Sequence, residues 1–134
     1  MFILDTDHVS ALMRGDAAVI SRVTALGNEP LAMSVVTLAE LLHGARYRGS
    51  AKIEGVIWQL ASNAHVLQVD TPTADRYASI RSRLWKIGKP LPENDYWIAA
   101  AAAAHAATLA TGDAHFAEVV EIKTENWIRP QGSR

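Results

Sequence analysis

Short apolar runs alternate along this chain with longer segments of helical periodicity, and this alternation restricts the fold more than any other feature. The runs fall at residues 2–4, 31–33, 65–69, 108–110 and 119–122. Short apolar strands that alternate with helices form parallel sheets whose two faces are both covered. The sequence therefore predicts an α/β fold of three layers, with a central parallel sheet and helices on both of its faces.

The segments between these runs carry the start and stop signals of helices. Ser34 is a suitable N-cap for one helix, while Thr71 and Pro72 open another that Gly88 closes. The helices are expected at residues 8–13, 17–26, 34–46, 52–63, 71–87 and, from Glu93 or Asn94 through an alanine-rich stretch, to residue 107. The sequence contains no repeat or linker, so residues 1–134 are expected to form a single domain.

The composition excludes several classes of protein. The chain has no cysteine, so it forms neither disulfides nor thiolate zinc sites. Its first residues lack the basic start of a signal peptide, and the alanine-rich run at 97–110 is too short to span a bilayer. A cytoplasmic protein without membrane contact is expected. The net charge of −1 argues against a constitutive coat of nucleic acid.

Four acidic residues fall where the predicted strands end or the predicted helices begin. Asp5 and Asp113 directly follow strands. Glu40 lies near the start of the helix after the second strand, and Asp95 lies in the first turn of the alanine-rich helix. Because sites in parallel sheets form beyond the carboxyl ends of the strands, the four carboxylates are expected to converge. Such a cluster suits one or two divalent cations such as Mg²⁺, which promote in-line displacement at a phosphodiester.

Each acid also has an ordinary structural interpretation. Asp5 is suited to cap the helix that begins near His8, and Asp95 to stabilise the start of its own helix through the helix dipole. Glu40 is compatible with the solvent face of an amphipathic helix, and Asp113 with a turn. The four acids together, rather than any one of them, favour a metal site.

The order of four motifs gives the chain a resemblance to a known family. FILDTDHVSAL, MSVVTLAELLHGA, LPENDYWIAAAAAAHAATLATGDAHF and the closing ENW resemble the PIN domain, and more narrowly the VapC toxin ribonucleases of toxin–antitoxin pairs. The resemblance runs from Phe2 to Trp127, and NDYWIAA followed by ATLATGDAHF is its most specific part.

This resemblance implies a fold, an activity and partners. It implies a PIN-like domain that hydrolyses RNA as an endoribonuclease, using water activated by one or two Mg²⁺ or Mn²⁺ ions. The positions that match the metal-site acids of the family are Asp5, Glu40, Asp95 and Asp113, with Thr6 and Thr111 expected to support them. The implied partners are an RNA substrate, a VapB-like antitoxin whose C-terminal segment covers the active site, and a second copy of the chain in a homodimer.

Asp7, His115 and the basic residues of 76–89 lie outside the set of four acids, and each allows more than one role. Asp7 departs from the small polar residue expected at its position. It would either bind metal through a water or cap the following helix, and the cap is the expected role. His115, close to Asp113, is expected either to pack structurally or to touch the substrate. Residues 76–89 carry five basic groups and no acid. They form either a solvated helix face or a surface for RNA phosphates, which Arg81 and Lys86 would contact.

Two other functions fit parts of the sequence. Asp5 and Asp7 match the opening motif of haloacid dehalogenase-type phosphatases, in which the first Asp is a nucleophile and the second an acid–base group. That interpretation leaves Glu40 and Asp95 without a role. A non-catalytic RNA-binding module predicts that at least one of the four acids is lost, and all four are present. Only the nuclease interpretation uses all four.

Overall fold

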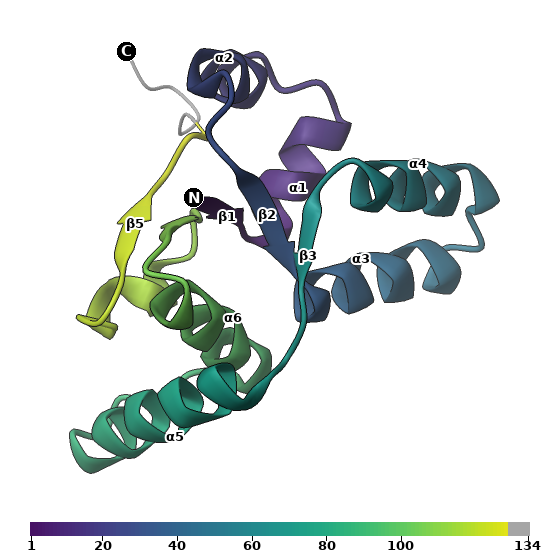
Figure 1. Cartoon of the computed structure of the whole chain (residues 1–134). Coiled ribbons are helices and arrows are strands. Elements are labelled where there is room, and N and C mark those ends of the chain that lie inside the picture. Colours follow the sequence, from purple (N-terminus) through teal and green to yellow (C-terminus); the bar gives the residue numbers. More distant parts are fainter. Residues whose placement is uncertain (129–134) are drawn as a thin grey trace.

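Five short strands lie side by side in one parallel sheet in the computed structural model, which describes residues 1–128 (Figure 1). They are β1 (Phe2–Leu4), β2 (Leu31–Ser34), β3 (His65–Leu67), β4 (Thr108–Ala110) and β5 (Lys123–Glu125), in the spatial order β3-β2-β1-β4-β5. In the central strand, Phe2 lies opposite Leu31 of β2 and Thr108 of β4. The predicted parallel sheet is confirmed. Residues 129–134 of the predicted domain lie outside the described residues.

The helices divide between the two faces of this sheet. One group comprises α1 (Thr6–Met13), α2 (Ala17–Leu26), α3 (Val35–Tyr47) and α4 (Ala51–Ser62), and the other α5 (Thr71–Lys86), α6 (Glu93–Ala104) and the 3₁₀ helix η1 (Ala114–Glu118). Because alternate residues of a strand face opposite sides, Leu4 packs with the first group and Ile3 with the second. Both faces are covered, as predicted. No helix within residues 1–128 is long and apolar enough to cross a membrane.

Helices of this chain begin at side chains that accept hydrogen bonds from free backbone amides of the first turn, as three examples show. Ser34 Oγ accepts from the amide of Val36 at 3.0 Å, and Asp70 Oδ1 accepts from the amide of Thr73 at 3.1 Å. Asp5 is the N-cap of α1, so this helix begins at Thr6 rather than at the expected residue 8. The capping role considered for Asp5 is therefore confirmed.

The alanine-rich helix α6 is packed closely against its surroundings. Ala99, Ala100 and Ala102 are fully buried, because a methyl side chain lets neighbouring elements approach. The prediction that the helix continues to residue 107 is wrong, since it ends at Ala104 and Ala106 has a φ of 49°. The amide of Ala107 donates to the carbonyl of Ala102 at 2.9 Å, which closes the helix in a Schellman-type turn.

The last strand begins directly after residues 119–122, the segment whose apolar character predicts a strand. Residues 119–122, predicted as a strand, follow η1 as a turn, with Val119 buried and Val120 exposed. β5 is the polar segment Lys123–Glu125, which pairs with β4 at the edge of the sheet. An edge strand with little buried surface is held mainly by its backbone pairing, so its side chains carry no apolar signal.

The pairing of β1 with β4 marks the point where the chain changes direction across the sheet. From β1 the chain continues to β2 and β3 on one side, whereas β4 and β5 lie on the other. α1 follows β1 on one face, and η1 follows β4 on the opposite face. Connections that leave toward opposite faces open a crevice at the carboxyl ends of the two strands. Asp5 and Asp113 lie at this crevice.

Candidate active site

Asp5 is a buried acid at the end of the central strand. Its Oδ1 accepts from the amide of Thr6 at 2.8 Å, and its Oδ2 accepts from Thr111 Oγ1 at 2.8 Å. Burial raises the pKa of Asp5 to about 6, the two hydrogen bonds oppose that rise, and the negative charges of Asp7 and Asp95 add to it. The carboxylate thus lies in a place that disfavours its own charge unless a cation is near.

Glu40 reaches the same crevice from α3. Its Oε1 accepts from Thr6 Oγ1 at 2.7 Å, and its Oε2 accepts from the side-chain amide of Asn94 at 3.3 Å. The structure thus brings Glu40 to the first turns of α1 and α6, instead of leaving it on a solvated helix face. Thr6, expected as a supporting residue, lies between Glu40 and Asp5.

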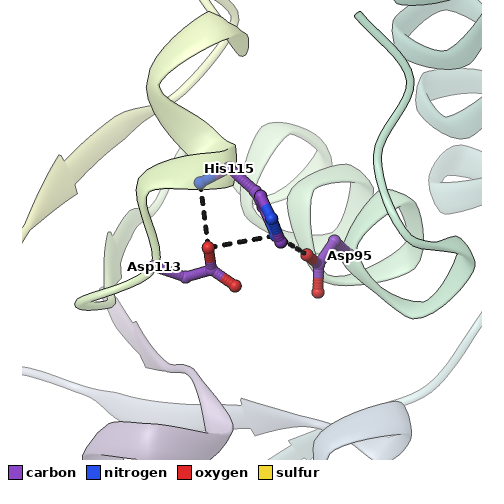
Figure 2. A group of neighbouring side chains, drawn as sticks. All are labelled: Asp95, Asp113 and His115. Carbon is purple, nitrogen blue, oxygen red and sulfur yellow. Dashed lines mark hydrogen bonds and ion pairs between the residues drawn. The ribbon is translucent and has the colours of Figure 1, made fainter.

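Asp95 and Asp113 meet around the ring of His115 (Figure 2). His115 Nδ1 lies 3.3 Å from Asp95 Oδ2 and 3.1 Å from Asp113 Oδ1, and one ligand atom of each residue lies within 4.8 Å of the other two. Burial raises the pKa of Asp95, the hydrogen bond with His115 opposes that rise, and the charges of Asp113 and Glu40 reinforce it. The four predicted acids therefore share one electrostatic environment.

Thr111 links two of these acids. Its hydroxyl donates to Asp5 Oδ2 at 2.8 Å and accepts from the backbone amide of Asp113 at 3.0 Å. The side chain is buried, so both bonds are shielded from water. Thr111 lies directly after β4 and therefore fixes the acid of the neighbouring strand, β1, relative to the turn that carries Asp113.

Asp7 does not cap a helix, contrary to the expectation from its position. It lies within the first turn of α1, where its Oδ2 accepts from the amide of Gly112 at 2.8 Å and its Oδ1 bonds to His8 Nδ1 at 2.8 Å. His8 Nε2 in turn accepts from the amide of Trp127 at 2.9 Å, so the proton lies on Nδ1 and Nδ1 is the donor to Asp7. Burial acts to raise the pKa of Asp7, but the bonds from His8 and Gly112 outweigh it and lower that pKa.

The donor set suits a hard divalent cation. Within residues 1–128, no Lys or Arg forms an ion pair with any of the four acids, and the recorded pairs are those of Asp95 and Asp113 with His115. Two of the carboxylates, Asp5 and Asp95, have raised pKa values because they are buried near other negative charges. Carboxylate oxygens and uncompensated negative charge suit hard divalent cations such as Mg²⁺ and Mn²⁺.

The basic helix α5 is only partly free to meet a ligand. Arg81 Nη1 pairs with Glu93 Oε2 at 3.0 Å and donates to the hydroxyl of Tyr77, which ties α5 to the first turn of α6. Lys86 is exposed near the end of α5. The structure does not bring Arg81 into the acid cluster, and the contact of Arg81 and Lys86 with RNA stays a prediction.

A groove of about 420 Å³ adjoins the acid cluster between α1, α3 and α4. Thr6 and Glu40 line it and also belong to the acid site. The rest of its lining is mainly apolar, with two arginines: Ser10, Met13, Arg14, Leu41, Gly44, Ala45, Arg48, Ile53 and Ile57. The groove therefore offers an apolar surface that leads directly to the acids.

Most of the chain matches a known class of protein in both sequence and fold. The sequence profile of the PIN domain matches residues 2–122. The chain therefore belongs to the PIN domain family, as its motifs indicated. This membership gives no support to the phosphatase interpretation, and the bonds of Asp7 to Gly112 and His8 leave it poorly suited to act as an acid–base group beside Asp5.

Within this family the chain is similar to VapC proteins. Ribonuclease VapC1 of Haemophilus influenzae strain R2866 is 30% identical over 136 residues, which cover 96% of this chain and 99% of the relative. The tRNA(fMet)-specific endonuclease VapC of Shigella flexneri is 30% identical, with 94% of this chain and 97% of the relative covered. The DNA-bound VapBC structure from Salmonella typhimurium superposes with a TM-score of 0.86 at 26% identity, over 94% of this chain and 97% of the matched chain.

Proposed function

We propose that this protein is a metal-dependent endoribonuclease and the toxin of a toxin–antitoxin pair. The observation that carries the proposal is the convergence of Asp5, Glu40, Asp95 and Asp113 at the crevice beside β1 and β4, without a Lys or Arg partner in the described part of the chain. Its similarity to VapC ribonucleases along nearly the full length of both chains supports the same conclusion.

The four acids are the groups that would hold one or two Mg²⁺ or Mn²⁺ ions. When bound, such an ion activates water and stabilises the oxygen that leaves the scissile phosphate. The chain's own residues set the positions of the carboxylates: Thr111 fixes Asp5, and Thr6 and Asn94 fix Glu40. These contacts restrict the carboxylates, and side chains that are held in place need less reorganisation when RNA binds.

The partner we propose is a small VapB-like antitoxin. The relatives of known structure include VapBC complexes from Salmonella typhimurium and from nontypeable Haemophilus influenzae. The groove between α1, α3 and α4 would accept an apolar segment of the antitoxin, and such a segment would end at Glu40 and block access to the acids. Thr6 and Glu40 belong both to the groove and to the acid site, so an antitoxin segment bound in the groove would also inhibit the nuclease.

RNA cleavage by the purified full-length chain tests this function. We expect cleavage in Mg²⁺ or Mn²⁺, complete arrest on chelation, and recovery when metal is added back. Asp95→Asn removes a negative ligand and should lower the cleavage rate by about 10²-fold or more, with the circular dichroism spectrum unchanged. Asp75→Asn is the matched control, because Asp75 is exposed on α5, and it should cleave at the parent rate.

Three outcomes would contradict the proposal. Cleavage that persists in chelator excludes the metal mechanism. RNA binding without cleavage under every metal tested indicates the non-catalytic module instead. Loss of activity in Asp7→Asn together with retained activity in Asp95→Asn would favour the phosphatase interpretation, because only that mechanism uses Asp7 as an acid–base group.

A further inference from the structure

His115 is not among the predicted acids, yet its ring lies at the centre of the site. Nδ1 is 3.3 Å from Asp95 Oδ2 and 3.1 Å from Asp113 Oδ1, so one nitrogen faces both carboxylates (Figure 2). Its side chain is 55% exposed, and the carboxylates of Asp95 and Asp113 are 14% and 35% exposed. The imidazole therefore covers the outer side of a pair of partly buried acids.

The backbone of His115 is held in place independently of its ring. Its amide donates to Asp113 Oδ1 at 2.9 Å, which makes Asp113 the N-cap of η1. Phe116, the next residue, is buried in the core of the α5 and α6 face and anchors this short helix. With the backbone fixed at both points, only the side-chain torsions of His115 remain to be set, and they direct Nδ1 toward the acids.

We propose that His115 is a nitrogen ligand of the cation held by Asp95 and Asp113, and that it makes the site prefer Mn²⁺ to Mg²⁺. The inference rests on the proposed function and adds to it the identity of the metal. Mg²⁺ takes oxygen ligands almost exclusively, whereas imidazole nitrogen suits first-row transition ions better. One nitrogen added to carboxylate oxygens therefore raises the affinity for Mn²⁺ and leaves that for Mg²⁺ nearly unchanged.

The alternative role for the ring predicts the opposite result. If His115 only donates hydrogen bonds to the two carboxylates, it competes with the cation for the same oxygens. Its removal would then strengthen the binding of Mn²⁺ and Mg²⁺ alike, because both ions gain the freed carboxylates. The sign of the change in affinity, and its dependence on the ion, separate a ligand from a hydrogen-bond donor.

The test is titration of the full-length protein and of His115→Gln with Mn²⁺ alone and with Mg²⁺ alone, followed by calorimetry. We expect His115→Gln to lower the affinity for Mn²⁺ by about tenfold or more and to change that for Mg²⁺ by less than about twofold. His105→Gln is the matched control, since His105 is an exposed C-cap residue of α6, and it should change neither affinity.

A spectroscopic measurement reports the ligand directly and without RNA. Electron spin-echo spectra of bound Mn²⁺ should show coupling to a nitrogen nucleus in the parent protein and in His105→Gln, and none in His115→Gln. Two results would overturn the inference. One is Mn²⁺ bound to the parent protein without nitrogen coupling, and the other is an equal loss of affinity for Mn²⁺ and Mg²⁺ in His115→Gln. Nitrogen coupling in a protein that cleaves no RNA would instead overturn the proposed function and leave this inference standing.

Discussion

Asp5 illustrates how a single buried acid can oppose stability and serve function. Its pKa is raised from 3.8 to about 6, so the folded protein holds this proton to a higher pH than the unfolded chain does. The contribution of Asp5 to the free energy of unfolding is therefore fully present below pH 3.8 and is lost as the pH rises through about 6. At pH 7.5 the ionised side chain costs about 3 kcal/mol in the absence of metal.

Asp5→Asn should consequently stabilise the metal-free protein while it abolishes cleavage. We expect the Tm at pH 7.5 in chelator to rise by about 10 °C, and the difference from the parent to disappear near pH 4. The increase in Tm that Mn²⁺ gives the parent should be smaller in the variant, because a ligand has been removed. Thermal unfolding between pH 4 and pH 8 measures both effects, and a difference that does not vary with pH would contradict the assignment.

Some residues of the site could be predicted from the sequence and others could not. Asp5 and Asp113 follow strands, and their convergence follows from parallel-sheet topology alone. Glu40 and Asp95 depended on the family motifs, since either could lie on a solvated surface. The contact of His115 with Asp95 joins η1 to α6, and no pattern along the chain specifies the orientation of that ring. The short spacing between Asp113 and His115 was the available signal.

At the scale of the elements, Ala106 is the residue whose backbone is least suited to its side chain. Its φ of 49° lies in the left-handed region, where a Cβ costs about 1 kcal/mol and glycine is the usual occupant. The position closes α6 and begins the turn into β4, so the turn is required by the fold. The sequence signals for a helix end were absent here, because eight alanines in the stretch from Ala99 to Ala107 predict continued helix.

Ala106→Gly should therefore stabilise the protein by about 1 kcal/mol, since Ala106 is exposed and loses little burial. Ala103→Gly is the control with the opposite sign. Ala103 lies inside α6 with a helical backbone, so the same substitution should cost about 1 kcal/mol. Urea unfolding of both variants measures the difference, and destabilisation by Ala106→Gly would show that the left-handed turn is not retained in solution.

The elements themselves were predictable where they bury apolar side chains. β1, β2 and β4 coincide with apolar runs, and the starts of α3 and α5 coincide with capping residues. β5 was misplaced because Lys123–Glu125 is polar and pairs through its backbone with β4. A strand that contributes pairing but little buried surface leaves no periodic pattern for sequence analysis to detect.

At the scale of the whole molecule, the distribution of charge decides how RNA is attracted. The net charge is −1, and the four acids repel phosphates until metal is bound. Basic groups lie on α5, where Arg81 is already paired with Glu93 and Lys86 is exposed. A protein of this kind is expected to contact only a few phosphates, so its affinity for RNA should fall by about tenfold between 50 and 200 mM salt.

The two predicted RNA contacts can be separated by their effect on this salt dependence. The affinity for RNA is best measured with the Asp95→Asn protein in Mn²⁺, because cleavage would otherwise disturb the measurement. Its logarithm, plotted against the logarithm of the salt concentration, gives the slope that counts phosphate contacts. Lys86→Ala should lower that slope by about 0.7 if Lys86 contacts a phosphate of single-stranded RNA. Arg81→Lys should leave the slope unchanged if Arg81 only holds α5 to α6. A slope unaffected by Lys86→Ala would exclude the predicted contact.

Assembly is also a property of the whole molecule, and local sequence patterns do not determine it. The homodimer stays a prediction, and sedimentation would measure it. Exposed apolar side chains lie on α4 and α5, Trp58 and Trp85 among them, but they do not define how two copies would pack. The choice of RNA target is likewise not set by the four acids, because they would act on a phosphodiester that every RNA contains. The fold followed from local pattern, whereas these properties depend on surfaces that several distant segments build together.

The adjacency of β1 and β4 also has a consequence for the time at which activity can arise. Asp5 follows β1, whereas β4 (Thr108–Ala110), which pairs with β1 and precedes Thr111 and Asp113, is synthesised much later. A nascent chain that has not yet released β4 and the turn with Thr111 and Asp113 contains no assembled site. The proposed site is therefore incomplete until these residues have been synthesised, and we expect a truncated product that ends before Thr108 to cleave no RNA, because it lacks Thr111 and Asp113.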